Sequence, residues 1–159
     1  MTTPAESTSV RHEVVVAAPI ERAFAVFTEE FDRIKPRDHN MLRVDIAETV
    51  FERRVGGHIF DRGVDGSECR WATILAYDPP HRFAFSWNIG LDWKLETNQD
   101  RTSEVEITFT EDGPDRTRVQ LEHRNIERHG DGWEKMGEAV GSPGGWPAGL
   151  ERFSAYLSA

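Results

Sequence analysis

His123 is the leading candidate for a side chain with a chemical role. Val119, Leu121 and His123 follow one another at two-residue spacing in a segment typical of a β-strand, so the imidazole is predicted to point inward among apolar neighbours. A buried imidazole must find a hydrogen-bond partner or stay neutral. It therefore either ties its strand to another element, such as the last helix, or recognises a ligand. The structural role is favoured because buried polar groups rarely go unpaired.

Asp61 is the second candidate, because it lies on the same strand face as Ile59. It is either a buried acid or a strand-end residue near Gly63. Exposure to solvent is the expected outcome, because an aspartate is seldom fully buried without a partner. In an enzyme, His123 or Asp61 would be the acid/base group.

Motifs of the common reaction types are missing from the sequence. There is no Gly-x-Ser-x-Gly elbow, and the lone Cys69 has neither an activating context nor a disulfide partner. His58, Asp61 and Glu68 come from adjacent predicted strands with mixed facing, which is no recognised metal-ligand set. The glycines within residues 141–145 precede a helix but follow no strand, unlike a phosphate-binding loop. The sequence therefore predicts no catalytic residue, no metal and no cofactor.

The composition is that of one globular domain. Of the 159 residues, 38% are hydrophobic and 30% are charged, which suffices for one continuous core. The formal net charge of −9 repels nucleic-acid phosphates and anionic membrane surfaces, so neither is an expected partner. No apolar run approaches the ~20 residues of a membrane span, and no basic start precedes an apolar run, so a cytoplasmic location is expected. Residues 1–9 are predicted to be a flexible tail and residues 10–159 a single domain.

Hydrophobic periodicity predicts one strand, a helix and then six strands. The first strand covers residues 10–17, and Pro19 opens an amphipathic helix that runs to about Phe31. Residues 32–41 show no periodicity and are predicted to be a loop. Residues 90–103 are either a wide hairpin loop or a ragged strand end. Period-two segments with short turns predict an antiparallel meander, with strands at residues 42–51, 54–61, 68–77, 81–89, 104–111 and 117–126.

Two helical patterns follow the strands. Asp131 is a candidate cap for a helix that carries Trp133, Met136 and Val140 on one stripe. Ser142 is predicted to cap a last helix over residues 143–157, whose apolar face repeats at steps of four, three and four. This order predicts an α+β fold, in which a curved antiparallel sheet of six to seven strands wraps around a long C-terminal helix.

Several motifs occur in an order that resembles one known family. They are the proline-led segment 18–24, the pair Gly56-Gly57 before Asp65-Gly66, the hairpin from Asp78 to Trp87, the strand at residues 117–124 and the helix opening at residues 142–153. Together they resemble the START-like, or SRPBCC, helix-grip superfamily (START/Bet v-like), in the branch similar to activators of the heat-shock protein 90 ATPase. The likeness spans residues 10–157.

The resemblance implies a cavity between the concave face of the sheet and the last helix. The residues expected to contact a ligand there are His123, Phe85, Trp87, Trp133, Met136, Trp146, Leu150, Lys35 and Asp61. Large aromatics at these spacings also occur as plain core, so this alternative stays open, and Trp87 and Trp146 are predicted to be largely buried. Where many relatives place two tryptophans, this chain has Ile34-Lys35. Lys35 is therefore expected to be a mobile cation at the cavity mouth that favours ligands with an acidic group.

The expected function is the binding of a small apolar or amphipathic molecule, without catalysis. Three alternatives stay open: an enzyme of the polyketide cyclase or hydro-lyase type, a co-chaperone-like module whose partner is a chaperone or another protein, and a dimeric scaffold without a ligand. Convergent titratable groups in the cavity would favour an enzyme. An apolar cavity with one polar group would favour a ligand-binding protein, and a filled interior would favour an interaction module. A monomer and a homodimer are both compatible with the sequence.

Overall fold

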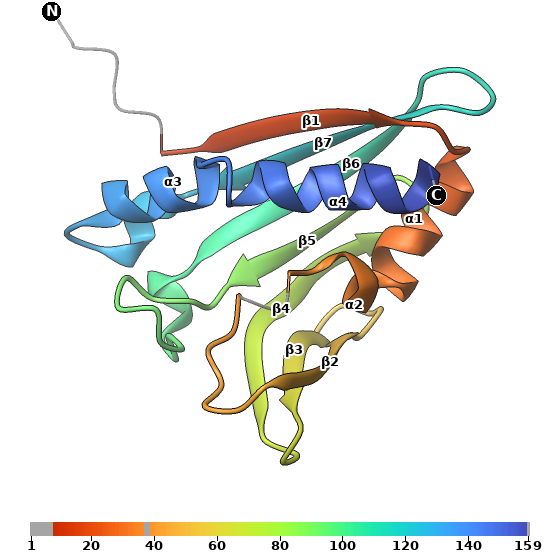
Figure 1. Ribbon diagram of the computed structural model, residues 1–159. Helices are drawn as coiled ribbons and strands as arrows, with labels where there is room; N and C mark the ends of the chain where they lie inside the picture. Colours follow the sequence, from red (N-terminus) through yellow and green to blue (C-terminus); the bar gives the residue numbers. More distant parts are fainter. Residues whose placement is uncertain (1–7, 37–38, 159) are drawn as a thin grey trace, which may run out of the picture.

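A single curved sheet forms the body of the protein (Figure 1). The computed structural model describes residues 8–36 and 39–158, so residues 1–7 of the predicted tail lie outside the described residues. Within these ranges, seven antiparallel strands pair in the order β1-β7-β6-β5-β4-β3-β2. Their bounds are β1 Val10–Val16, β2 Ile46–Phe51, β3 His58–Gly63, β4 Glu68–Asp78, β5 Arg82–Trp87, β6 Ser103–Glu111 and β7 Thr117–Arg124.

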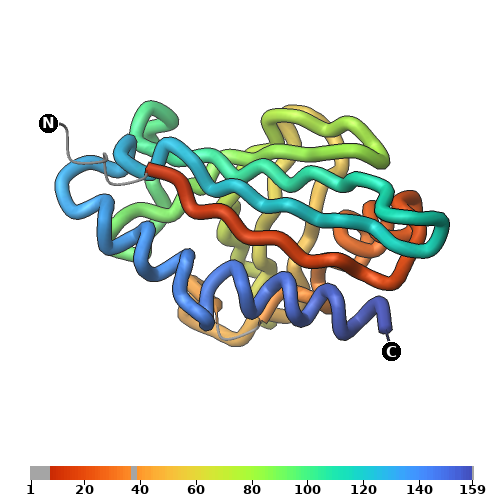
Figure 2. The backbone as a smooth tube through the Cα atoms, turned by 90° about the horizontal axis from the view of Figure 1, so that it is seen from above, coloured from red at the N-terminus to blue at the C-terminus, as the bar shows by residue number. Residues whose placement is uncertain are grey.

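The helices come from the two ends of the chain. The helix α4 runs alongside β1 (Figure 2) and packs inward through Leu150, Phe153 and Leu157, which are all buried. No helix in the described ranges is long and apolar enough to cross a bilayer. The predicted α+β helix-grip architecture is confirmed. The helical segments are α1 Ile20–Glu29, α2 Phe31–Ile34, α3 Trp133–Gly141 and α4 Trp146–Ser158, with 3-10 turns η1 Gln99–Arg101 and η2 Ile126–His129.

Strand alternation fixes which side chains face the helices. In β6 and β7, every second residue is buried, so Val105, Ile107 and Phe109 share the inner face with Val119 and Leu121. The helix α1 places Phe24 and Phe27 over this face, and the ring centroid of Phe27 lies 4.8 Å from that of Phe153 in α4. Aromatic burial therefore joins the first helix, the sheet and the last helix in one core.

Three register shifts bend the β2–β5 half of the sheet. They fall between Ile46 and Glu48, between Ile59 and Phe60, and between Ile74 and Ala76. At the second shift, Ile59 pairs with Ala72 and Phe60 with Arg70, so Trp71 is the extra residue of β4. Such bulges increase local bending and twist. The bend keeps this half of the sheet away from α4 and leaves room between them.

Several predicted boundaries need correction. The first helix ends at Glu29, and α2 follows it inside the segment that was predicted to be a loop. The strand expected at residues 54–61 begins only at His58, because residues 54–57 form a turn in which Gly57 N–H donates to the Arg54 carbonyl. Residues 90–102 are a loop that contains the turn η1 and pairs with Ile89 through one isolated bridge at Leu95, and Ser103 already belongs to β6.

The predicted helix caps are also different in the structure. Asp131 does not cap α3, which begins after Gly132 in a left-handed conformation without a side-chain cap. Ser142 ends α3 rather than opening α4, because its hydroxyl donates to the Ala139 carbonyl at 2.7 Å. The last helix begins at Trp146, three residues later than predicted. The intervening residues 143–145 form a tight turn between the two helices.

Candidate functional site

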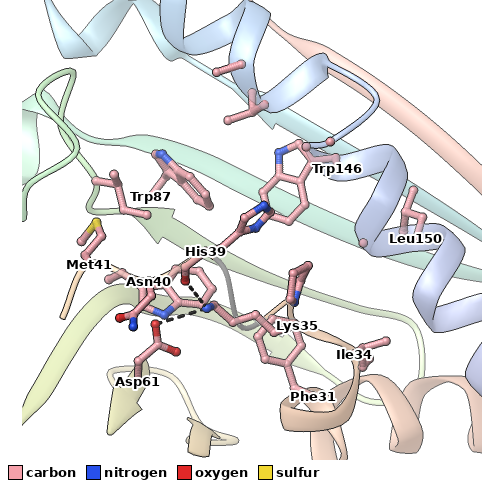
Figure 3. A pocket seen from close by; sticks show the side chains of 18 of the residues that line it. Phe31, Ile34, Lys35, His39, Asn40, Met41, Asp61, Trp87, Trp146 and Leu150 are labelled. Atoms are coloured by element: carbon pink, nitrogen blue, oxygen red, sulfur yellow. Dashed lines mark hydrogen bonds and ion pairs between the residues drawn. The ribbon is translucent and has the colours of Figure 1, made fainter. Parts of the chain in front are cut away.

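A cavity of about 570 Å³ lies between the bent half of the sheet, α2 with the segment after it, and the α3–α4 junction (Figure 3). Six aromatic rings contribute to its walls: Phe27, Phe31, Trp71, Trp87, Trp93 and Trp146. Most of the other lining residues have aliphatic or small side chains. The polar side chains in the lining are Lys35, His39, Asn40, Asp61 and Ser142. The interior of this domain is therefore not packed solid.

The tryptophans Trp87 and Trp146 form one wall. Their ring centroids are 5.4 Å apart in an edge-to-face arrangement, and Trp71 meets Trp87 in the same way at 5.8 Å. Trp87 and Trp146 were predicted to be largely buried, and both are partly buried against the core, while part of each ring faces the cavity. Trp87, the last residue of β5, and Trp146, the first residue of α4, thus present indole surface to a ligand-sized space.

A Lys35–Asp61 ion pair forms the opposite wall (Figure 3). The Lys35 Nζ lies 3.2 Å from the Asp61 Oδ2, and the two side chains are only 10% and 3% exposed. The Thr49 hydroxyl donates to the Asp61 Oδ1 at 2.7 Å. The Lys35 ammonium also donates to the His39 carbonyl at 2.6 Å and lies 5.9 Å from the centre of the Trp71 ring. The pair is therefore held from several sides.

Two sequence expectations about this pair were wrong. Asp61 was expected to be exposed, but it is buried, because Lys35 and Thr49 supply the partners that a buried carboxylate needs. Lys35 was expected to be a mobile cation at the mouth, but it is held in the wall by Asp61 and the His39 carbonyl. These two residues lie 26 positions apart, and no pattern in the sequence indicates that they meet.

Cys69 lies opposite Asp61 in the β3–β4 pairing. Burial, and then the negative charge of Asp61, raise the pKa of its thiol to about 11. A thiol with such a pKa stays protonated at neutral pH, so Cys69 is a core residue and not a nucleophile.

His123 lies behind the cavity wall rather than in it. It is fully buried, and its Nδ1 accepts a hydrogen bond of 3.1 Å from the indole N–H of Trp146. Its Nε2 lies 2.7 Å from the Ser103 hydroxyl, which also lies 2.7 Å from the Nε2 of His129. Because an indole N–H can only donate, neutral His123 accepts at Nδ1 and donates at Nε2. The predicted tie between this strand and the last helix is therefore present.

Burial keeps both imidazoles neutral. Loss of solvation, and then the neighbouring His129, lower the pKa of His123 to about 3. Burial likewise lowers the pKa of His129, against a smaller opposite effect of Glu96. At neutral pH, the network of Trp146, His123, Ser103 and His129 carries no charge. It holds the Trp146 ring by a directed hydrogen bond.

Some of the residues that were predicted to contact a ligand line the cavity, and others do not. The cavity lining includes Lys35, Asp61, Trp87, Trp146 and Leu150. It does not include His123, Phe85, Trp133 or Met136. Phe85 is buried under Trp146, whose ring centroid lies 6.4 Å away, while Met136 packs with Ile126 and Val140 in a second small core that Trp133 covers. Strand and helix periodicity identifies the inward face, but not which inward residues border a void.

Sequence reasoning missed other lining residues. Trp71 reaches the cavity at a bulge, and a bulge leaves no clear signal in a strand pattern. Trp93 comes from the loop after β5, where its φ of 61° is left-handed. His39, Asn40 and Met41 come from the end of the segment that was predicted to be a loop, and all three line the cavity.

The site offers no evident metal centre. Among residues 8–36 and 39–158, no three His, Cys, Asp or Glu side chains are grouped to hold a metal ion. The chemistry that the cavity can perform rests on aromatic surface, hydrogen bonds and the Lys35–Asp61 pair.

A curved antiparallel sheet that wraps around a C-terminal helix and encloses an aromatic cavity defines an α+β protein of the helix-grip class. The family model described as "Activator of Hsp90 ATPase homolog 1-like protein" matches residues 17–158. The chain therefore belongs to this family. Among curated proteins, no sequence match was found.

Solved structures extend this result. The chain is 39% identical to Txn09, an anthrahydroquino-gamma-pyrone synthase, with 96% of this chain and 99% of that chain covered and a TM-score of 0.66. It is 28% identical to CalC from Micromonospora echinospora, a self-sacrificing resistance protein, with coverage of 96% and 95% and a TM-score of 0.70. It also shares its fold with NE0264 from Nitrosomonas europaea, at 15% identity, coverage of 99% and 98%, and a TM-score of 0.67.

Proposed function

We propose that the protein binds a flat, oxygenated aromatic molecule in the cavity. The observation that carries this proposal is a space of about 570 Å³ walled by indole and phenyl rings, with one polar pair on the opposite side. Cavities of this size hold drug-sized ligands, and a few polar groups then set the orientation. Aromatic walls favour ring systems, because edge-to-face and offset contacts add to the burial of apolar surface.

The open interior favours a ligand-binding role over a surface interaction module. An interaction module would have no need of an unfilled space among its largest aromatic residues, since each void forfeits packing contacts. The similarity to Txn09 supports the same ligand class, because that protein is a synthase of an anthrahydroquino-gamma-pyrone.

Ring closure on such a molecule is a second candidate function. It is favoured by the 39% identity to a synthase over nearly the whole chain, and by two titratable groups that meet in the cavity wall. The cavity would hold a flexible chain of the substrate in a folded conformation, while Lys35 polarises a carbonyl oxygen. The binding experiment comes first, because both functions require the cavity to be occupied.

Gly149 provides a direct test of cavity occupancy. It lies in α4 and lines the cavity, and a Cβ at this position would meet nothing within 4 Å. Gly149→Phe is expected to fill the cavity without a backbone clash and to lower the affinity for 1-hydroxyanthraquinone at least about tenfold. Quenching of tryptophan fluorescence measures the binding, because four of the cavity residues are tryptophans.

The control is Gly149→Ala. This change adds one methyl group, leaves most of the space open and raises helix propensity by about 1 kcal/mol. It is expected to bind the probe as the wild type does and to melt at a higher temperature. Equal affinity of wild type, Gly149→Ala and Gly149→Phe would show that the probe binds elsewhere, and the proposal would then be abandoned.

A further inference from the structure

Among the described residues that line the cavity, Lys35 and Asp61 form an ion pair. The two side chains carry opposite charges 3.2 Å apart, and both are largely shielded from solvent beside the aromatic residues of the lining. Thr49 holds the Asp61 carboxylate and the His39 carbonyl holds the Lys35 ammonium, so the two charged groups are fixed with respect to each other. A ligand meets them as one neutral, strongly polar unit.

A ligand carboxylate does not fit this unit well. An anion that approaches the Lys35 Nζ also approaches the Asp61 carboxylate, whose Oδ2 is only 3.2 Å from that nitrogen. The attraction to one group is then offset by the repulsion from the other, and both are strong where water is scarce. The anion also loses its hydration on entering the cavity, and no net positive charge of the pair compensates for this loss.

A neutral hydroxyl group beside a carbonyl group fits better. The hydroxyl can donate to Asp61, since a carboxylate offers about four lone-pair positions and the contacts from Thr49 and Lys35 use one each. The neighbouring carbonyl oxygen then faces the ammonium group of Lys35 and brings no net charge. Hydrogen bonds to ionised partners are stronger than those between neutral groups.

We infer that the Lys35–Asp61 pair selects aromatic ligands whose polar end is a neutral phenol or enol hydroxyl next to a carbonyl, and discriminates against carboxylates. This inference rests on the proposed function and specifies its ligand class. It replaces the expectation from the sequence, in which a mobile Lys35 at the cavity mouth favoured ligands with an acidic group.

Three probes with one ring system test the inference: anthraquinone, 1-hydroxyanthraquinone and anthraquinone-1-carboxylate, each titrated at pH 7.5. The wild type is expected to bind the hydroxy compound about tenfold more tightly than either of the others. In Asp61→Asn, the negative charge is lost while the shape is kept. The preference is expected to reverse there, with the carboxylate gaining about tenfold and the hydroxy compound losing affinity.

A double variant covers the case in which Asp61→Asn does not fold, because a single charge left in a buried site is destabilising. Lys35→Met/Asp61→Leu removes both charges and replaces them with apolar side chains of similar size. It is expected to bind anthraquinone and 1-hydroxyanthraquinone with nearly equal affinity, while the carboxylate binds more weakly because nothing offsets the loss of its hydration. Arg11→Met/Glu122→Leu serves as the matched control, since it also removes an ion pair, with N···O 2.8 Å, but outside the cavity lining, and it is expected to keep the wild-type order.

The outcomes separate the two proposals. If the wild type binds all three probes equally, or if the order of affinities is the same in the Lys35 and Asp61 variants as in the wild type, the inference about the pair is wrong while the cavity remains a binding site. If no probe binds to the wild type, the proposed function itself fails for this ring system, and the inference fails with it.

Discussion

Trp93 has a backbone conformation that bulky side chains rarely adopt. Its φ is 61°, and the turn around it is held by hydrogen bonds from Trp93 N–H to the Gly90 carbonyl and from Gly90 N–H to the Lys94 carbonyl. A left-handed conformation costs about 1–2 kcal/mol for a residue with a Cβ, and such strain gathers at ligand-binding positions. The ring remains 51% exposed although it borders the cavity. Trp93 therefore contributes less to the free energy of unfolding than a buried tryptophan would.

Trp93→Gly is expected to separate stability from binding. Glycine relieves the left-handed strain but adds freedom to the unfolded chain, so the free energy of unfolding should stay the same or rise by up to about 1 kcal/mol. The affinity for 1-hydroxyanthraquinone should fall about tenfold, because one aromatic contact at the mouth is lost. Urea denaturation and fluorescence titration of the same samples measure the two effects.

Leu95→Ala is the control for Trp93→Gly. Leu95 is also exposed and lies in the same loop, but it is not in the cavity lining. Leu95→Ala should therefore leave the affinity for 1-hydroxyanthraquinone unchanged. A clear loss of stability in Trp93→Gly with no loss of affinity would identify Trp93 as an ordinary packing residue.

At the scale of elements, the junction between α3 and α4 is the tightest contact near the cavity. A Cβ at Gly145 would lie 2.7 Å from the Ala139 carbonyl oxygen and closer still to the carbonyl of Val140. Only glycine fits between the two helices at this point. The close approach sets the direction in which α4 leaves the turn, and hence the position of the Trp146 ring in the cavity wall.

Gly145→Ala is expected to lower the free energy of unfolding by about 1–3 kcal/mol, because the atoms in its way are backbone atoms that cannot turn aside. The neighbouring Gly144→Ala is the matched control, since a Cβ there meets nothing within 4 Å and should change stability little. Thermal and urea denaturation of both variants check this difference. Equal stability of the two variants would show that the helices can separate without cost.

The elements were more predictable from the sequence than the site. Period-two and helical patterns predicted the strands and the last helix, because buried positions carry mostly apolar residues and exposed positions mostly polar ones. The cavity depends on features without such a pattern: the bulge at Trp71, the left-handed turn at Trp93 and the pairing of Lys35 with Asp61. Five of the nine predicted contact residues line the cavity. The helix caps at Asp131 and Ser142 were misplaced, because Gly132 precedes α3 in a left-handed conformation and the Ser142 hydroxyl donates to the Ala139 carbonyl.

For the whole molecule, the two buried imidazoles make stability depend on pH. His123 is neutral in the folded state down to about pH 3, whereas in the unfolded chain it binds a proton near its ordinary pKa of 6.5. The unfolded state therefore binds more protons between these values, and stability falls as the pH drops from about 6.5. His129, whose pKa is also lowered, acts in the same direction. Above about pH 7 this contribution is fully present.

His123→Gln is expected to reduce this pH dependence. Glutamine can accept from Trp146 and donate to Ser103 but does not titrate. The free energy of unfolding of the wild type should change with pH between 6.5 and 4 more steeply than that of the variant, by up to about 1.4 kcal/mol per pH unit. Urea denaturation at half-unit pH steps measures both slopes. Parallel slopes would mean that His123 takes up its proton in the folded state, contrary to the burial found here.

The cavity is closed by segments that are far apart in the sequence. The Arg152 side chain in α4 donates to the carbonyl of Ile34 in α2 at 2.9 Å, and the Tyr156 hydroxyl donates to Glu30 at 2.6 Å. During synthesis, all seven strands leave the ribosome before α4 does, so the concave face of the sheet is without this cover for several seconds at normal elongation rates. A nascent chain of this kind exposes indole and phenyl rings to its surroundings until α4 has been made, and synonymous codon changes that slow the synthesis of residues 125–158 should raise the fraction of aggregated protein.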